Sequence, residues 1–260
     1  MQVKIEEFQK NIEKFKLINF IPEIHTYEIG GKVAKSVTSI IKEYLKPFER
    51  DYWANIKAKQ LGVDVNEILE KWQFNAKFSQ IKGTLVHEFI EYKLTNREFI
   101  YPQELIECEF GFDPIQEPFH QIINVVNKYL SDIQDKLVPV ASELIIGDID
   151  YLVCGTVDQV FYNKKSNNLE IWDWKTNKEI KLESRYFHLQ PLSHIPDTEL
   201  DHYSLQLSLY KLILEKNTGI TLGNSYITWF NENLPKYQIF TAKDYYKEAQ
   251  ILLNNIVKGN

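Results

Sequence analysis

Three closely spaced β-rich runs between residues 141 and 176 constrain the fold more than any other feature of the sequence. They read ASELIIG, YLVCGTVDQVFY and NLEIWDWKT, and the segments that join them, around Gly147 and Asp148 and at 163–168, are rich in turn-forming residues. Strands joined by short turns pair in antiparallel fashion. The pattern therefore predicts an antiparallel meander of three strands.

Helical patterns lie on both sides of these runs. Apolar residues recur at three- and four-residue spacing, which is typical of helices with one buried face. The expected elements are a helical segment at 37–60 that is broken at Pro47 and capped by Thr38 and Ser39, a helix from Gly83 to about Leu94, a loop at 186–200, a helix at 202–216, a strand at 224–232 and a helix at 242–257. The predicted order is helix, three strands, helix and strand, inside helical flanks.

Composition and the absence of linkers favour one globular domain. Hydrophobic residues make up 44% of the chain and aromatic residues 13%, which is enough to form a large core. No internal repeat and no Pro/Gly/Ser-rich linker divides the sequence. We expect a single domain over 1–260, with a mostly helical elaboration at 1–80, a core at 81–232 and a C-terminal strand and helix at 233–260.

The sequence also restricts location and metal chemistry. The start, MQVKIEEFQK, lacks the pattern of a signal peptide, and no run approaches the roughly 18 apolar residues of a membrane span, so a cytoplasmic protein without a membrane partner is expected. Cys108 and Cys154 are the only cysteines, which excludes a disulfide framework and a four-cysteine cluster in one chain. Any metal must be bound by oxygen and nitrogen ligands. The net charge of −6 argues against a protein coated in positive charge.

Two acidic residues and one lysine lie on neighbouring predicted strands. Asp173 and Lys175 are two residues apart on a strand, so they share one face with α-carbons roughly 7 Å apart. If the register places Asp158 opposite them, two carboxylates and an amine meet at one point, an arrangement suited to phosphodiester hydrolysis with a hard cation. By itself a D-x-K triplet is more often a solvated strand face or a simple ion pair.

The context of these residues favours a site. The runs LVCGTVDQVF and LEIWDW place both acids within apolar strands, where an unpaired carboxylate is costly. Glu143 on the preceding strand can reach the same pocket, although a surface residue at a strand end is an equal alternative. His87 lies on the polar side of its helix with Glu91 one turn later. A lone helical histidine is more often structural, so a metal-binding role for His87 requires support from the other motifs of the chain.

An ordered set of motifs resembles the PD-(D/E)xK nuclease superfamily, within it the RecB-type and phage-type exonuclease branch. The set consists of GTLVHEFIE with His87, then Glu143, GTVD with Asp158, IWDWKT with Asp173 and Lys175, and Q-x-x-x-Y with Gln206 and Tyr210. It spans residues 83 to 210, about half of the chain. The stretch at 25–41, HTYEIGGKVAKSVTSII, also resembles the start of phage-encoded and mitochondrial genome-maintenance exonucleases of this superfamily.

The resemblance implies a fold, a cofactor and a set of roles. The fold is an α/β restriction-endonuclease-like αβββαβ core, whose mixed central sheet is flanked by helices. One or two Mg²⁺ or Mn²⁺ ions are implied and no iron–sulfur cluster. The implied metal ligands are His87, Asp158, Asp173 and the backbone carbonyl of Trp174. The implied catalytic group comprises Asp158, Asp173, Lys175 and Glu143, and the residues that support the site or contact the strand being cut are Gln206, Tyr210 and Thr176.

The expected function is hydrolysis of DNA, by an exonuclease that processes ends or single strands in phage or bacterial recombination, repair or replication. No G-x-x-x-x-G-K-[ST] loop is present, so a helicase or recombination partner must be a separate chain. The alternatives are a non-catalytic DNA-binding or scaffold protein on the same fold, an endonuclease, and an enzyme that acts on RNA. The cluster KEYLKPFERDYW at 42–53 can stack on bases, but inward packing is favoured for Phe48 and Trp53. The oligomeric state is left open.

Overall fold

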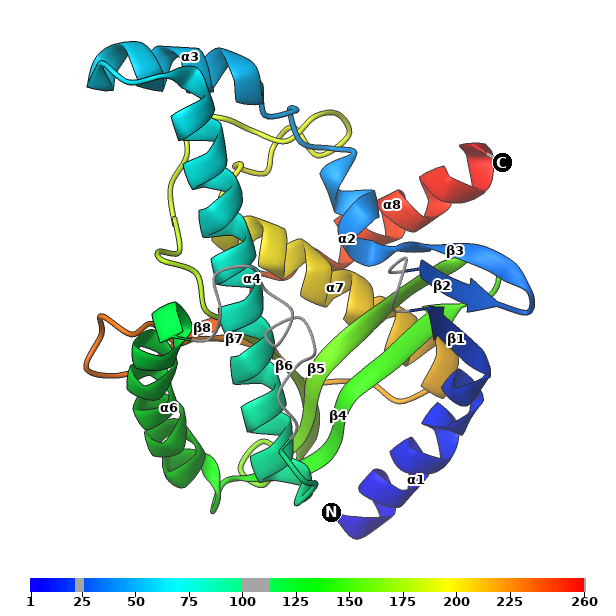
Figure 1. The fold of residues 1–260 in the computed structure, drawn as a ribbon. Coiled ribbons are helices and arrows are strands. Elements are labelled where there is room, and N and C mark those ends of the chain that lie inside the picture. The colour runs from blue at the N-terminus through cyan, green and yellow to red at the C-terminus, as the bar shows by residue number, and fades with distance from the viewer. Residues whose placement is uncertain (22–25, 100–112, 260) are drawn as a thin grey trace.

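The computed structural model describes residues 1–21, 26–99 and 113–259. Within them a mixed sheet is flanked by helices on both faces (Figure 1). The helices are α1 Gln2–Ile12, the short 3₁₀ helix η1 Glu13–Leu17, α2 Val37–Lys42, α3 Arg50–Leu61, α4 Val65–Thr95, α6 Asp113–Ile133, α7 Glu199–Thr218 and α8 Tyr246–Gly259. The strands are β1 Ile18–Ile21, β2 Thr26–Ile29, β3 Lys32–Ser36, β4 Leu137–Asp148, β5 Val153–Asn163, β6 Asn168–Lys175, β7 Ser225–Trp229 and β8 Gln238–Thr241.

The sheet confirms the predicted meander and the αβββαβ order. Strand β5 pairs antiparallel with both β4 and β6, and β6 pairs parallel with β7 across the crossover made by α7. The order α4, β4–β5–β6, α7 and β7 is that of the expected core. Because β3 also pairs parallel with the start of β5, the sheet is mixed and continues into the N-terminal strands.

Several boundaries differ from the prediction. Helix α4 begins at Val65, where Asp64 caps it by accepting from the Asn66 amide at 2.8 Å, so Gly83 lies inside the helix and does not start it. The cap of α2 is Ser36, whose hydroxyl accepts from the Ser39 amide, and not Thr38 or Ser39. Helix α6 and strands β1–β3 were not predicted.

The two largest clusters of buried residues pack against opposite faces of the sheet. Side chains of successive strand residues point to opposite faces. Ile171 packs with α7 and α8 in one cluster, whereas Trp172 and Trp174 pack with α4 and α6 in the other. Strand residues with the parity of Ile171 therefore face α7, and Asp173 and Lys175 belong to this set.

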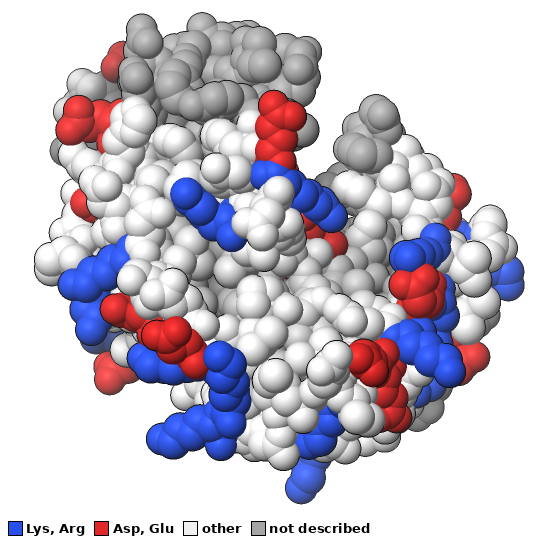
Figure 2. Space-filling view, turned by 90° about the horizontal axis from the view of Figure 1, so that it is seen from below, with Lys and Arg blue, Asp and Glu red and all other residues white. Residues whose placement is uncertain are grey.

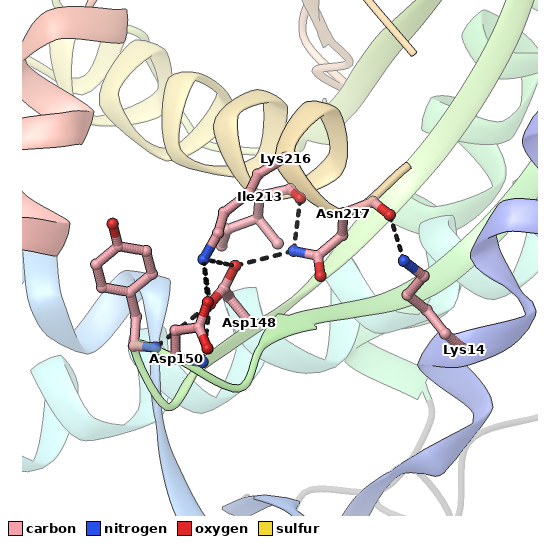
Figure 3. A network of polar contacts seen from close by, with 7 residues as sticks. Lys14, Asp148, Asp150, Ile213, Lys216 and Asn217 are labelled. Carbon is pink, nitrogen blue, oxygen red and sulfur yellow. Dashed lines mark hydrogen bonds and ion pairs between the residues drawn. The ribbon is translucent and has the colours of Figure 1, made fainter. Parts of the chain in front are cut away.

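A polar network fixes the C-terminal end of α7 to the turn between β4 and β5 (Figure 3). Lys216 Nζ lies 2.8 Å from carboxylate oxygens of both Asp148 and Asp150, and Asn217 Nδ2 donates to Asp148 at 3.0 Å. Lys14 from η1 donates to the backbone carbonyl of Asn217. The helix that covers this face of the sheet is thus held at the end remote from Lys175.

No helix in the described part of the chain combines the length and apolarity that crossing a bilayer requires.

Candidate functional site

Three residues from three elements bring metal-binding atoms together. His87 on α4, Glu143 on β4 and Asp158 on β5 each offer one ligand atom, and these atoms lie within 4.8 Å of one another. His87 Nδ1 is 3.6 Å from Glu143 Oε1 and 3.7 Å from Asp158 Oδ2. Such a set of one imidazole and two carboxylates suits a divalent cation.

Glu143 occupies its place through an unusual backbone conformation. The β4–β5 ladder pairs Ser142 with Gln159 and Leu144 with Val157, so Glu143 lies across from Asp158 between these two pairs. Its φ is +45°, in the left-handed region that a side chain with a Cβ rarely adopts. Conformations of this kind cost roughly 1–3 kcal/mol and cluster at functional sites. Glu143 is therefore a residue within the strand, and the alternative of a strand-end surface residue is wrong.

Asp173 and Lys175 lie beside this group of three. The β5–β6 ladder ends at the pair of Gln159 and Trp172, so the next residues along the two strands, Asp158 and Asp173, are neighbours. The Trp174 amide donates to Asp158 Oδ2 at 2.7 Å. Lys175 Nζ is 2.6 Å from Asp173 Oδ2, and these two side chains are 17% and 3% exposed. The hairpin thus places both aspartates and the lysine at one point.

The site has three carboxylates, on Glu143, Asp158 and Asp173, and only two basic groups, on His87 and Lys175. Burial raises the pKa of Asp173 to about 6, although Lys175 opposes the shift, and burial also raises the pKa of Asp158. Burial lowers the pKa of His87, but the charges of Asp158 and Glu143 outweigh it and raise the pKa to about 9. A bound cation relieves this repulsion, so the electrostatics fit a metal site.

The imidazole of His87 is oriented for metal binding. Its Nε2 lies 3.1 Å from the backbone carbonyl oxygen of Trp174, which accepts a hydrogen bond when Nε2 carries the proton. In that tautomer Nδ1 presents a lone pair toward Glu143 and Asp158. A hydrogen bond from the other ring nitrogen to a carbonyl commonly fixes a metal-binding histidine. The Trp174 carbonyl, expected as a ligand, is here a partner of His87, and its role as a ligand stays a prediction.

Helix α7 supplies Gln206 and Tyr210. Gln206 Nε2 donates to the Tyr210 hydroxyl at 2.9 Å. Burial raises the pKa of this hydroxyl, and the charges of Asp173 and Asp158 raise it further. The ring of Tyr210 covers Gly155, where an added Cβ would lie 2.4 Å from Cε1. The glycine of the GTVD motif therefore makes room for the tyrosine.

Thr176 lies where α4 passes the end of β6. Its hydroxyl oxygen is 3.4 Å from the position that a Cβ on Gly83 would take, one turn before His87. A Cβ at Gly83 would therefore come only to the edge of ordinary van der Waals contact with Thr176. On the same helix, the buried side chain of Lys82 forms an ion pair at 2.9 Å with Glu232, a residue that follows β7. Thr176 thus has a packing position beside the site, and contact with a substrate stays a prediction.

Tyr203 and Asn177 lie near the site although the sequence motifs do not include them. Tyr203 on α7 lies against Lys175, with Nζ 4.6 Å from the ring centroid, and Asn177 Nδ2 donates to its hydroxyl at 2.5 Å. The signal was present, since Tyr203 precedes Gln206 by three residues and so shares its side of the helix.

The expected inward packing of Phe48 and Trp53 is wrong. Their side chains are 67% and 45% exposed at the start of α3, and Tyr52 between them is 57% exposed. The short α3 packs on α4 through Ala54, Ala58 and Ile68. Phe48 contacts the ring of Trp72 at a centroid distance of 5.9 Å but stays largely exposed.

Charge and cysteine chemistry agree with the limits that the sequence sets. On the face in Figure 2, basic and acidic side chains lie interspersed around a largely uncharged centre, so this face has no continuous basic surface. Cys154 is buried with a free thiol, and burial raises its pKa to about 12. Cys108 lies outside the described residues.

Comparison with known proteins gives a similarity to solved structures only, and one of these structures is described below. No protein-family model matches the sequence, and no curated protein matches it. Among solved structures, the chain is similar to a crystal structure from Eubacterium rectale described as a "Putative exonuclease". The similarity has a TM-score of 0.45 at 17% identity and covers 70% of this chain and 68% of that one. At these values it supports no conclusion about family or activity.

Proposed function

We propose that this protein is a metal-dependent nuclease that hydrolyses DNA phosphodiester bonds. The observation that carries the proposal is the convergence of His87, Glu143 and Asp158 within 4.8 Å of one another, next to the ion pair of Asp173 and Lys175. The ordered motifs of the sequence, which resemble those of PD-(D/E)xK nucleases, support the same conclusion independently of the coordinates.

The metal in this proposal is Mg²⁺ or Mn²⁺. His87 Nδ1 and the carboxylates of Glu143 and Asp158 hold it, and Asp173 and the Trp174 carbonyl are the further ligands that the resemblance implies. When bound, such an ion lowers the pKa of a coordinated water and offsets negative charge on a phosphate. The surplus of carboxylates and the pKa of about 6 at Asp173 support a site that is completed by a cation.

Lys175 acts in this proposal as a fixed positive charge. Burial alone lowers the pKa of its ammonium, but Asp173 and Asp158 outweigh burial and raise it. In this proposal the amine of Lys175 orients or helps to deprotonate the attacking water, and its protonated form stabilises charge on the phosphate. Asp173 aligns the ammonium from one side.

The finer proposal is an exonuclease that acts on DNA ends or single strands in phage or bacterial recombination, repair or replication. It is supported by the likeness of the motifs to the RecB-type and phage-type branch. A helicase or recombination partner is a separate chain in this proposal, and the site of action is the cytoplasm.

A timed digestion with Mg²⁺ or Mn²⁺ tests the proposal. The substrates are end-labelled linear duplex, circular duplex, single-stranded DNA and a matched RNA strand, and the variants are Lys175→Ala and Asp158→Asn, with Lys32→Ala on β3 as an exposed control. Removal of catalytic groups lowers rates by several orders of magnitude. We expect linear or single-stranded DNA to be degraded by the wild type and the control only.

Each alternative gives a different result. Cleavage of circular duplex indicates an endonuclease, and degradation of the RNA strand alone makes DNA the wrong substrate. Tight DNA binding in Mg²⁺ without cleavage of any substrate supports the non-catalytic protein. Equal rates for the wild type and Lys175→Ala remove the assignment of this site.

A further inference from the structure

The ammonium of Lys175 contacts both a carboxylate and an aromatic ring. Asp173 Oδ2 is 2.6 Å from Nζ, and the centroid of the Tyr203 ring is 4.6 Å from the same atom. A cation within about 6 Å of a ring centroid is attracted by the negative face of the ring. Since the lysine side chain is only 17% exposed, water screens this attraction weakly.

The ring of Tyr203 is itself held by other elements. Its hydroxyl accepts from Asn177 Nδ2 at 2.5 Å. The backbone carbonyl of Asn177 in turn accepts from Trp229 Nε1 at 2.8 Å and from Asn231 Nδ2 at 3.2 Å. The residues at and after the end of β7 therefore anchor the segment after β6, and this segment anchors the hydroxyl end of a ring that α7 carries.

We propose that Tyr203 is a positioning residue that holds the Lys175 ammonium in the candidate site, with Asn177 anchoring the hydroxyl end of the ring. A lysine has four rotatable side-chain bonds and loses up to about 2 kcal/mol of conformational entropy when it is fixed. A contact with the carboxylate alone leaves the ammonium free to rotate about that contact. The ring adds a second contact, so the amine is already in place when a substrate arrives. The positioning of Lys175 for hydrolysis rests on the proposed function.

The first test compares rates of metal-dependent DNA cleavage. Tyr203→Leu removes the ring, and Tyr203→Phe keeps it without the hydroxyl. The matched control is Tyr151→Leu, which removes a similar contact remote from the site, where Lys216 Nζ lies 4.4 Å from the Tyr151 ring. We expect kcat to fall about 2- to 30-fold in Tyr203→Leu with an unchanged KM. We expect Tyr203→Phe, which keeps the ring but loses its hydrogen bond from Asn177, to lower kcat less than Tyr203→Leu does. We expect Tyr151→Leu to stay close to the wild type.

The second test reads the position of the lysine without any activity. The protein is labelled with ¹³C-lysine, and the Lys175 side-chain resonance is assigned from its loss in Lys175→Met. A ring face close to the ammonium shifts the neighbouring methylene protons upfield. We expect the full shift in the wild type, a smaller shift in Tyr203→Phe, which loses the hydrogen bond from Asn177, and no shift in Tyr203→Leu.

The two tests separate the proposals. If the wild type cleaves no nucleic acid, the proposed function fails, and the resonance still decides whether the ring holds the amine. A wild-type kcat or an unchanged Lys175 resonance in Tyr203→Leu overturns the positioning role. If Tyr203→Leu does not fold, as judged by circular dichroism, Asn177→Ala replaces it, because this change keeps the ring and frees it. An unaltered Lys175 resonance together with wild-type kcat in Asn177→Ala then overturns the proposal.

Discussion

Gly155 is a position where a single methyl group should disturb the site through packing alone. A Cβ at this residue would lie 2.4 Å from Cε1 of Tyr210, whereas ordinary carbon contacts are about 3.5–4.0 Å. The tyrosine is only 4% exposed and has little room to retreat. Overpacking of this kind costs about 1–3 kcal/mol, so we expect Gly155→Ala to lower the free energy of unfolding by that amount.

A double-mutant cycle measured by urea denaturation isolates the cause. Tyr210→Leu removes the ring that the methyl group would meet, so Gly155→Ala should cost under about 0.5 kcal/mol in that background. Gly155→Ala should also reduce cleavage, because it displaces Tyr210 and its partner Gln206. Overpacking is refuted as the cause if the alanine costs the same in both backgrounds, or if it leaves the stability of the wild type unchanged.

Three further predictions concern other positions. Burial raises the pKa of Asp201, but hydrogen bonds, led by the one from Lys243, lower it below the ordinary value of 3.8. The carboxylate therefore stabilises the fold above pH 3.8, and this contribution is lost as the pH falls through the lower pKa of the folded state. In urea titrations we expect Asp201→Asn to lower the free energy of unfolding by about 3 kcal/mol at pH 7 and by less below pH 3.8, and an equal effect at every pH contradicts this. Because Glu143 has a φ of +45°, Glu143→Gly should be about 1 kcal/mol more stable than Glu143→Ala, and the reverse order in thermal melts argues against strain there. Phe48→Ser and Trp53→Ser remove exposed rings and should each change the free energy of unfolding by no more than about 0.5 kcal/mol; a loss of about 3 kcal/mol instead indicates core packing.

The core of the fold was predictable because its signals are local. Alternating apolar residues with short turns specify the three strands, and the i, i+2 spacing alone puts Asp173 and Lys175 on one face. The hairpin between β5 and β6 allows only a few registers of strand pairing, and the observed register makes Asp158 a neighbour of Asp173. The order of helices and strands around the meander follows from the same periodicities.

The remaining features depend on contacts that the sequence does not display. The left-handed backbone conformation of Glu143 arises within a long paired strand, and the residue type at this position does not predict a positive φ. Helix α4 continues through Gly83 because the cap at Asp64 and packing outweigh the helix-weakening effect of one glycine. Phe48 and Trp53 look like core residues by composition, but the buried contact between α3 and α4 is made by Ala54, Ala58 and Ile68, and both rings stay exposed.

Crystals grown with Mn²⁺ and measured at the manganese absorption edge decide whether the three side chains from α4, β4 and β5 bind a cation together. We expect one anomalous peak within coordination distance of His87 Nδ1 and the carboxylates of Glu143 and Asp158, and no peak in Asp158→Asn crystals. A wild-type site that stays without manganese at saturating concentration, or a peak remote from these three side chains, would show that they do not form a metal centre.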